Sequence, residues 1–220
     1  YGAVARPPRY GATLARAEAG TATDMPGVIA VVIEDGFAGI VAQTRQQAHN
    51  ALSNLVLEWE GGSVMTQDEL EAYMRVPDDA DDAILVQREG NGAQPDGRVI
   101  QADYWTPMAA HAHLEPQAAL VSVEDDRVVA YISTQHPGIP RGDLASLLDI
   151  PPEHVDIRVT YLGAGFGRKL GQDVGVEAAR LSRSAGVPVH VGWTREEDLQ
   201  HGFHRPPSHN VLTAILDSSD

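Results

Sequence analysis

The order of apolar and polar positions along residues 1–62 predicts a small strand–strand–helix–strand unit. Residues 25–33 and 36–44 are nearly continuous apolar runs that begin at proline or glycine turns, which is typical of buried strands. Thr44 and Gln47 have the spacing of a capping box, so a helix is expected to follow them. Apolar positions then recur every three or four residues, and a last strand pattern leads to a glycine pair.

Residues 63–98 have a different character. They are rich in acidic residues, glycine, proline and asparagine, as in the stretches PDDADDA and REGNGAQPDG. Such a composition favours turns and contact with solvent over a packed core. We therefore expect an exposed linker or an irregular excursion here.

Regular patterns return after residue 98 and predict a second unit. An alternating stretch around Glu124 predicts a hairpin, and residues 141–150 predict a short helix that ends at two prolines. Asp173 is expected to cap the next helix, and Gly186 to close it. Thr194 and Glu197 have the spacing of a second capping box, at the start of a short helix. The last strand pattern, at residues 209–217, is expected to lack its partner strand. The chain is thus predicted to be an α+β protein in three parts, residues 1–62, 63–98 and 99–220.

The composition narrows the classes of function. Hydrophobic residues make up 43% of the 220 residues and charged residues 21%, which is ordinary for a globular domain. No apolar run approaches the roughly 20 residues of a membrane-spanning helix. The net charge of −15 disfavours nucleic acid as a partner, because an acidic surface repels phosphate. The lack of cysteine excludes disulfides, thiolate zinc sites and iron–sulfur clusters held by this chain. None of this decides between the bacterial cytoplasm and the periplasm.

A glycine-rich loop is the strongest candidate for chemistry. Three glycines, Gly163, Gly165 and Gly167, follow a predicted strand and lead toward a predicted helix. Glycine lets the backbone approach a ligand closely, and successive N–H groups in such a turn can bind an anion. Arg168 and Lys169 would add positive charge. The alternative is a tight turn with solvated basic side chains, and neither a P-loop nor a dinucleotide-binding fingerprint fits the spacing.

Four ordered motifs give this loop a context. They are HAHLEPQAAL (111–120), STQHPGIPRGDLA (133–145), GAGFGRK (163–169) and PVHVGWTREEDLQHGFHRPP (188–207). Together they resemble the molybdopterin-binding large subunits of the xanthine dehydrogenase and aldehyde oxidase family, with the isoquinoline 1-oxidoreductase beta subunit group as the nearest resemblance. Residues 21–60 look like that family's α/β hammerhead domain. The resemblance covers most of the chain except residues 63–98.

The resemblance implies a cofactor and a set of residues around it. Molybdenum would be held by the dithiolene of molybdopterin, in the cytosine dinucleotide form, with no metal ligand from the protein. Gln135 would donate a hydrogen bond toward a molybdenum oxo ligand, and the glycine loop would lie against the metal centre and the pterin. The cofactor-binding residues implied are Gln135, Gly163, Ala164, Gly165, Phe166, Gly167 and Arg168.

The resemblance also implies a reaction and partners. The parent enzyme would hydroxylate an N-heterocycle or an aldehyde with oxygen from water. Its electrons would leave through an iron–sulfur small subunit, and a cytochrome or another acceptor would follow. The family's catalytic glutamate has no counterpart here, so we interpret the chain as an N-terminal portion with a trimmed start. Alone, it is expected to hold no molybdenum and to be inactive.

Two departures from the family pattern bear on this interpretation. The family has three successive glycines before the phenylalanine, and Ala164 replaces the middle one, at a cost of about 1 kcal/mol if that position needs positive φ. Purine-type members carry a glutamate where this chain has Leu170, so a purine substrate is not expected.

Two alternatives stay open at this point. The chain could be a non-catalytic module for assembly or cofactor delivery. It could also be an unrelated α/β domain that binds a metal through its histidines, because two of them have the H-x-H spacing that places both rings on one face of a strand, and two others would lie one turn apart on a helix. Surface or structural roles are the preferred interpretation of the histidines. Glu115 is a candidate acid or base, but the resemblance favours a structural turn. The five histidines considered are His111, His113, His201, His204 and His209.

Overall fold

The computed structural model describes residues 1–75, 84, 86–90, 96–171 and 173–216. The chain divides into two compact units, each built from two segments. The large unit contains residues 1–64 and 110–203, and the small unit contains residues 65–109 and 204–220. Among the described residues, no helix is long and apolar enough to cross a membrane.

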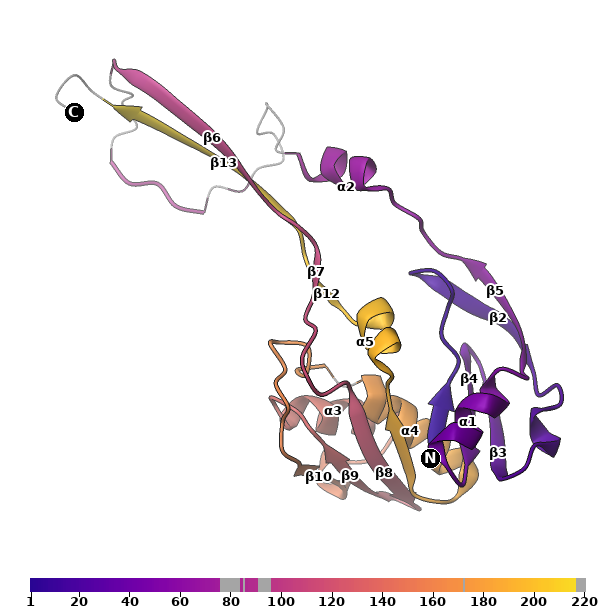
Figure 1. The fold of residues 1–220 in the computed structure, drawn as a ribbon. Coiled ribbons are helices and arrows are strands. Elements are labelled where there is room, and N and C mark those ends of the chain that lie inside the picture. The colour runs from indigo at the N-terminus through magenta and orange to yellow at the C-terminus, as the bar shows by residue number, and fades with distance from the viewer. Residues whose placement is uncertain (76–83, 85, 91–95, 172, 217–220) are drawn as a thin grey trace. The chain divides into compact units, whose positions relative to one another are not determined.

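A mixed seven-stranded sheet forms the centre of the large unit (Figure 1). Two neighbouring pairs, β1–β11 and β9–β10, run parallel, and the other pairs run antiparallel. Together with the helices of this unit, the sheet confirms the predicted α+β class. In spatial order the strands are β10 (Val155–Val159), β9 (Arg127–Ile132), β8 (Ala118–Glu124), β11 (Val189–Gly192), β1 (Gly2–Val4), β4 (Phe37–Ala42) and β3 (Val28–Glu34).

Helices cover both faces of this sheet near its middle. The helix α1 (Arg45–Leu52) packs with Ile40 and Ala42 in one apolar cluster, whereas α4 (Asp173–Ala185) packs with Val41 in another. Successive side chains of a strand point to opposite faces, so β4 is buried on both sides. This explains why its sequence is a continuous apolar run instead of an alternating one.

Local sequence signals begin two helices and end a third as predicted, whereas Asp173, expected to cap α4, is the first residue of that helix. The capping box of Thr44 and Gln47 is present at α1, and that of Thr194 and Glu197 is present at α5 (Arg195–His201). Gly186 follows α4 with a φ of 65°, which suits a residue without a Cβ.

One helix differs from its predicted bounds. The helix α3 (Gly138–Leu148) begins three residues earlier than expected, and it ends at Asp149 before the two prolines. Asp149 adopts a left-handed conformation, which aspartate tolerates better than most residues.

The remaining elements of the large unit are short. The predicted hairpin turns at Asp125, whose φ is 45°, and joins β8 to β9. A separate two-stranded sheet pairs β2 (Ala12–Glu18) with β5 (Val56–Gly61). Two 3-10 helices complete the unit, η1 (Ala22–Asp24) and η2 (Pro152–His154).

The small unit contains the strand predicted at residues 209–217 and further regular structure that the sequence patterns did not indicate. Where a linker was expected, a capping box of Thr66 and Glu69 begins the helix α2 (Gln67–Met74). The strand β13 (Ser208–Leu216) does have a partner, because it pairs with β6 (Arg98–Thr106) over nine residues. The expectation of a missing partner strand was wrong, since the partner lies more than a hundred residues earlier. A further pair consists of β7 (Ala109–Ala110) and β12 (His204–Arg205).

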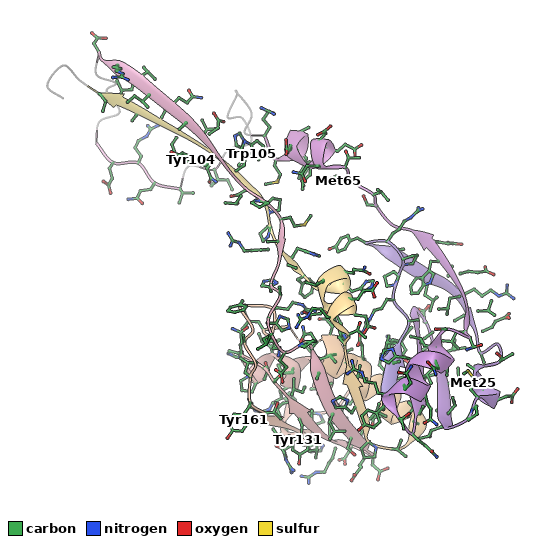
Figure 2. All side chains as sticks on the ribbon, in the orientation of Figure 1. Met25, Met65, Tyr104, Trp105, Tyr131 and Tyr161 are labelled. Atoms are coloured by element: carbon green, nitrogen blue, oxygen red, sulfur yellow. The ribbon has the colours of Figure 1, made fainter. Side chains whose placement is uncertain are left out.

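Tyr104 and Trp105 lie on β6 (Figure 2). The Trp105 ring stacks on His209 of β13 with 3.9 Å between ring centroids, yet the residue is 41% exposed. Trp193, in contrast, is buried in the core of the large unit.

The compact units group the segments differently from the predicted parts. Within residues 1–62, only β2 and β5 pair in a sheet of their own, whereas β1, β3 and β4 join β8–β11 in one sheet. Most of the predicted excursion, from residue 65 onward, falls in the small unit together with residues 204–220. The stretch PDDADDA, on which the prediction of an exposed linker partly rested, lies outside the described residues.

Candidate functional site

The loop Gly163–Lys169 lies in the large unit between β10 and α4, as its sequence position predicted. Its backbone departs from ordinary conformations, with φ of 67° at Ala164, 53° at Phe166 and 97° at Gly167. Ala164 therefore does have positive φ, and the Cβ of an alanine in this conformation costs about 1 kcal/mol or more. Phe166 is 70% exposed, and Tyr161, just before the loop, is fully exposed (Figure 2).

Three neighbouring N–H groups in this loop have no internal partner. The N–H groups of Ala164, Gly165 and Phe166 donate to none of the described residues. Because φ is positive at Ala164 and Phe166 and not at Gly165, the loop has the alternation from which anion-binding nests are built. The loop therefore offers a small group of backbone donors to an acceptor from outside the chain.

Gln135 lies against this loop, just after β9. Its side-chain Oε1 accepts the Gly167 N–H at 2.9 Å, and its backbone N–H donates to the Lys169 carbonyl at 2.9 Å. A Cβ on Gly165 would lie 2.3 Å from that Oε1, so only glycine leaves room for the amide. With Oε1 occupied, the Gln135 Nε2 donates to no described residue and is available as a further donor.

Glu115 lies at the base of the loop. Its Oε2 accepts hydrogen bonds from the Gly163 N–H at 3.0 Å and from the Lys169 ammonium. Burial alone would raise the pKa of Glu115, but hydrogen bonds from Lys169, the Gly163 N–H and Ser133 keep that pKa below its usual value. Glu115 is thus held as a carboxylate that braces the loop, which agrees with a structural turn and disfavours the role of a proton donor.

The two basic residues of the loop are buried, contrary to the solvated side chains of the tight-turn alternative. Arg168 donates to Asp173 at 2.7 Å and, with the Gln117 amide oxygen turned toward it, to Gln117 at 2.9 Å. Its guanidinium also lies 4.8 Å from the centre of the Phe203 ring. Lys169 is fully buried. Both charges are therefore used inside the protein.

The histidines of the HAH motif lie beside the site but do not form a metal centre. His111 Nδ1 lies 3.0 Å from the Phe203 carbonyl oxygen, and His113 is buried with its Nε2 3.3 Å from Asp198 Oδ1. Burial lowers the pKa of His113, and Lys169 and nearby arginines lower it further, against the opposite influence of Asp198. Within the described ranges, no group of three or more histidine, cysteine or acidic side chains could hold a metal ion.

The structure therefore brings together all the predicted loop residues and Gln135, while directing the Arg168 side chain inward. The sequence did not indicate that Glu115, Ser133 and Thr134 hold the two ends of the loop through hydrogen bonds to Gly163 and Lys169. The motifs that contain these residues were visible, but nothing in them says which residues meet in space.

The family model for the molybdopterin cofactor-binding domain matches residues 86–218, more than half of the chain. The chain belongs to this family. The resemblance expected from the four motifs is thereby confirmed, and the alternative of an unrelated metal-binding domain is wrong.

Similar proteins extend the match beyond this domain. The isoquinoline 1-oxidoreductase subunit beta of Brevundimonas diminuta is 28% identical over 99% of this chain and 30% of its own length. The xanthine dehydrogenase molybdenum-binding subunit of Escherichia coli is 34% identical over 74% of this chain and 23% of its own length. This member of the molybdopterin cofactor-binding domain family therefore spans about a third or less of the relatives it matches.

A solved structure shows the same fold. The quinoline 2-oxidoreductase of Pseudomonas putida superimposes with a TM-score of 0.78 at 21% identity, covering 98% of this chain and 34% of that one. The fold of this chain is thus that of a segment of the quinoline 2-oxidoreductase chain.

Proposed function

We propose that Gln135 and the loop Gly163–Gly167 form one wall of the molybdopterin cofactor pocket. The observation that carries this proposal is the group of unpartnered N–H donors at residues 164–166, next to the available Nε2 of Gln135. All of these donors are uncharged. They suit the oxygen atoms of an anionic cofactor, because they donate without requiring a counter-ion.

The residues present fit a molybdopterin group. The donors are on the backbone and on one amide, which is what a cofactor with its own metal ligands requires from the surrounding protein. When bound, the cofactor supplies the redox-active centre at which the substrate is oxidised. Gly163, Ala164, Gly165, Phe166 and Gly167 would contact it. Arg168 would contribute by holding the loop, because its guanidinium is engaged with Asp173.

We further infer the role of the whole protein from its relatives. It would be the molybdenum-binding large subunit of an oxidoreductase that hydroxylates an N-heterocycle or an aldehyde with oxygen from water. Two relatives carry heterocycle names, isoquinoline 1-oxidoreductase and quinoline 2-oxidoreductase, and this supports the heterocycle. Leu170, in place of the glutamate that purine-type members carry, argues against a purine.

The partners follow from the same inference. Relatives are named as subunits, which supports assembly with other chains. A separate iron–sulfur subunit would take the electrons and pass them to a cytochrome or another acceptor, and none of the 220 residues is a cysteine that could hold such a cluster. The cofactor form we propose is the cytosine dinucleotide.

The proposal can be tested by removing the Gln135 amide. Gln135→Ala in the complete subunit should lower the molybdenum and pterin content per protein at least about tenfold, since loss of such a supporting contact to a metal site typically costs 10–100-fold in affinity. Gln46→Ala, at an exposed position on α1, is the matched control and should leave both contents unchanged. Unchanged cofactor content in Gln135→Ala would overturn the proposed pocket. Bound cofactor without turnover of any heterocycle or aldehyde would instead favour a delivery module.

A further inference from the structure

Lys169 is the only lysine among the 220 residues, and it is fully buried at the end of the cofactor loop. The other fifteen basic residues are arginines. A buried ammonium is costly unless it is paired and hydrogen-bonded, so its partners reveal what it holds together.

Both ends of the loop meet at one carboxylate oxygen. The first residue, Gly163, donates its N–H to Glu115 Oε2 at 3.0 Å, and the last residue, Lys169, donates its ammonium to the same oxygen. The Gly163 carbonyl in turn accepts the Glu115 N–H at 3.1 Å. A Cβ on Gly163 would lie 2.5 Å from the Glu115 Cβ, so the two backbones approach as closely as glycine allows.

The end of β9 secures Lys169 from the other side. Ser133 Oγ accepts from the Lys169 ammonium at 3.2 Å. The Lys169 carbonyl accepts from Thr134 Oγ1 at 3.1 Å and from the Gln135 N–H at 2.9 Å. The same three-residue segment therefore holds the loop end and presents the Gln135 amide to Gly167.

We propose that Glu115 and Lys169 form a clasp of two positioning residues that sets the shape of the loop before any cofactor binds. Fixing both loop ends on one oxygen removes much of the conformational freedom that residues 163–169 would otherwise lose on binding. The clasp also sets the distance from Gln135 to the loop donors, because Ser133, Thr134 and Gln135 are tied to the same lysine. The cofactor-facing part of this inference rests on the proposed function, whereas the clasp does not.

Two measurements test the clasp. The first is the rate at which an acylating reagent modifies Lys169, resolved by mass spectrometry of the peptide that contains it. Lys169 should resist acylation in the folded protein, and Glu115→Gln should raise its acylation rate by at least about tenfold, because glutamine has no negative charge to compensate the buried ammonium. Glu58→Gln is the matched control, since Glu58 is an exposed partner of Arg16 and lies outside the loop.

The second measurement is hydrogen exchange of the peptide 163–169. Glu115→Gln and Lys169→Met should speed exchange there and leave the strands β4 and β8 unchanged, which separates loss of the clasp from general unfolding. Lys169→Arg keeps a cation for Glu115 and should restore slow exchange and cofactor content in part.

The outcomes separate the clasp from the proposed function. Rapid acylation of Lys169 in the folded wild-type protein, or equal loop exchange in all variants, would overturn the clasp. Rapid loop exchange in Glu115→Gln with full cofactor content would overturn its positioning role and leave the pocket standing. Failure of Gln135→Ala to change cofactor content, with Lys169 still protected, would overturn the pocket and leave the clasp standing.

Discussion

Gly165→Ala is the smallest change that should disturb the proposed pocket. The backbone of Gly165 does not have positive φ, so alanine is conformationally acceptable there. Its Cβ, however, would lie 2.3 Å from Gln135 Oε1 and 2.8 Å from Cδ, where ordinary contact begins near 3.4 Å. The Gln135 amide must therefore retreat.

The size of the effect follows from that retreat. Moving Oε1 by about 1 Å breaks its hydrogen bond to the Gly167 N–H, because such bonds weaken steeply beyond about 3.2 Å. The bond is 2.9 Å long in the native loop. Its loss should lower the free energy of unfolding by about 1 kcal/mol. Alanine also makes the unfolded chain less flexible than glycine does, and this offsets about 0.5 kcal/mol of the lost free energy of unfolding.

The assay is hydrogen exchange at the Gly167 amide together with urea unfolding. We expect the Gly167 amide to exchange roughly five to ten times faster in Gly165→Ala, with a small loss of stability and reduced cofactor content in the complete subunit. Gly142→Ala, on α3, is the matched control, because a Cβ at Gly142 would have open space around it, with no neighbouring side chain within 4 Å. It should stabilise the protein by about 0.5–1 kcal/mol. Native-like protection of Gly167 in Gly165→Ala would refute the reasoning.

Three further predictions concern stability. Ala164→Gly should raise the free energy of unfolding by about 0.5–1 kcal/mol, measured by urea titration. The reason is that removing the Cβ from a left-handed residue stabilises the folded state by more than the added freedom of glycine stabilises the unfolded chain. A lower free energy of unfolding would contradict the inferred strain at Ala164. Glu177→Ala should lower the free energy of unfolding by roughly 3 kcal/mol, since Arg6 and the Trp193 Nε1–H would lose a buried hydrogen-bond partner. A loss below about 1 kcal/mol would show that Arg6 finds another carboxylate partner. Burial, together with Arg45 and the N-terminal ammonium, lowers the pKa of His190 below its ordinary 6.5. As the pH falls below 6.5, the unfolded chain therefore binds a proton at this histidine before the folded chain does, and the free energy of unfolding decreases. His190→Gln should therefore flatten the decline of the urea midpoint between about pH 7 and about pH 5, and an unchanged slope would exclude His190 as a contributor.

The sequence predicted well the features that depend on neighbouring residues. The capping boxes at Thr44 and Thr194 are present, as is the hairpin turn at Asp125, because a cap or a tight turn is satisfied within a few residues. The α2 helix shows the limit of the prediction. Its capping box at Thr66 was equally local, but the acidic and glycine-rich composition around it favoured a linker.

Pairings between distant segments could not be predicted in this way. The partner of β13 is β6, and β1 joins β11 of the later segment to form one sheet. An alternating pattern states that a strand has a buried face, but it does not name the strand beside it. The predicted three-part division differs from the compact units for this reason.

The family, the α+β class and the position of the loop follow from the residues alone, because ordered motifs and glycine content are properties of the chain. The uncharged character of Gln135 and the lack of cysteine in these 220 residues follow in the same way. The inward direction of Arg168 and Lys169 follows only from the folded structure. A side chain becomes buried when distant partners can satisfy its charge, and Glu115 lies 54 positions from Lys169 along the chain. The same long-range contacts leave the N–H groups of residues 164–166 without an acceptor among the residues that the structure describes.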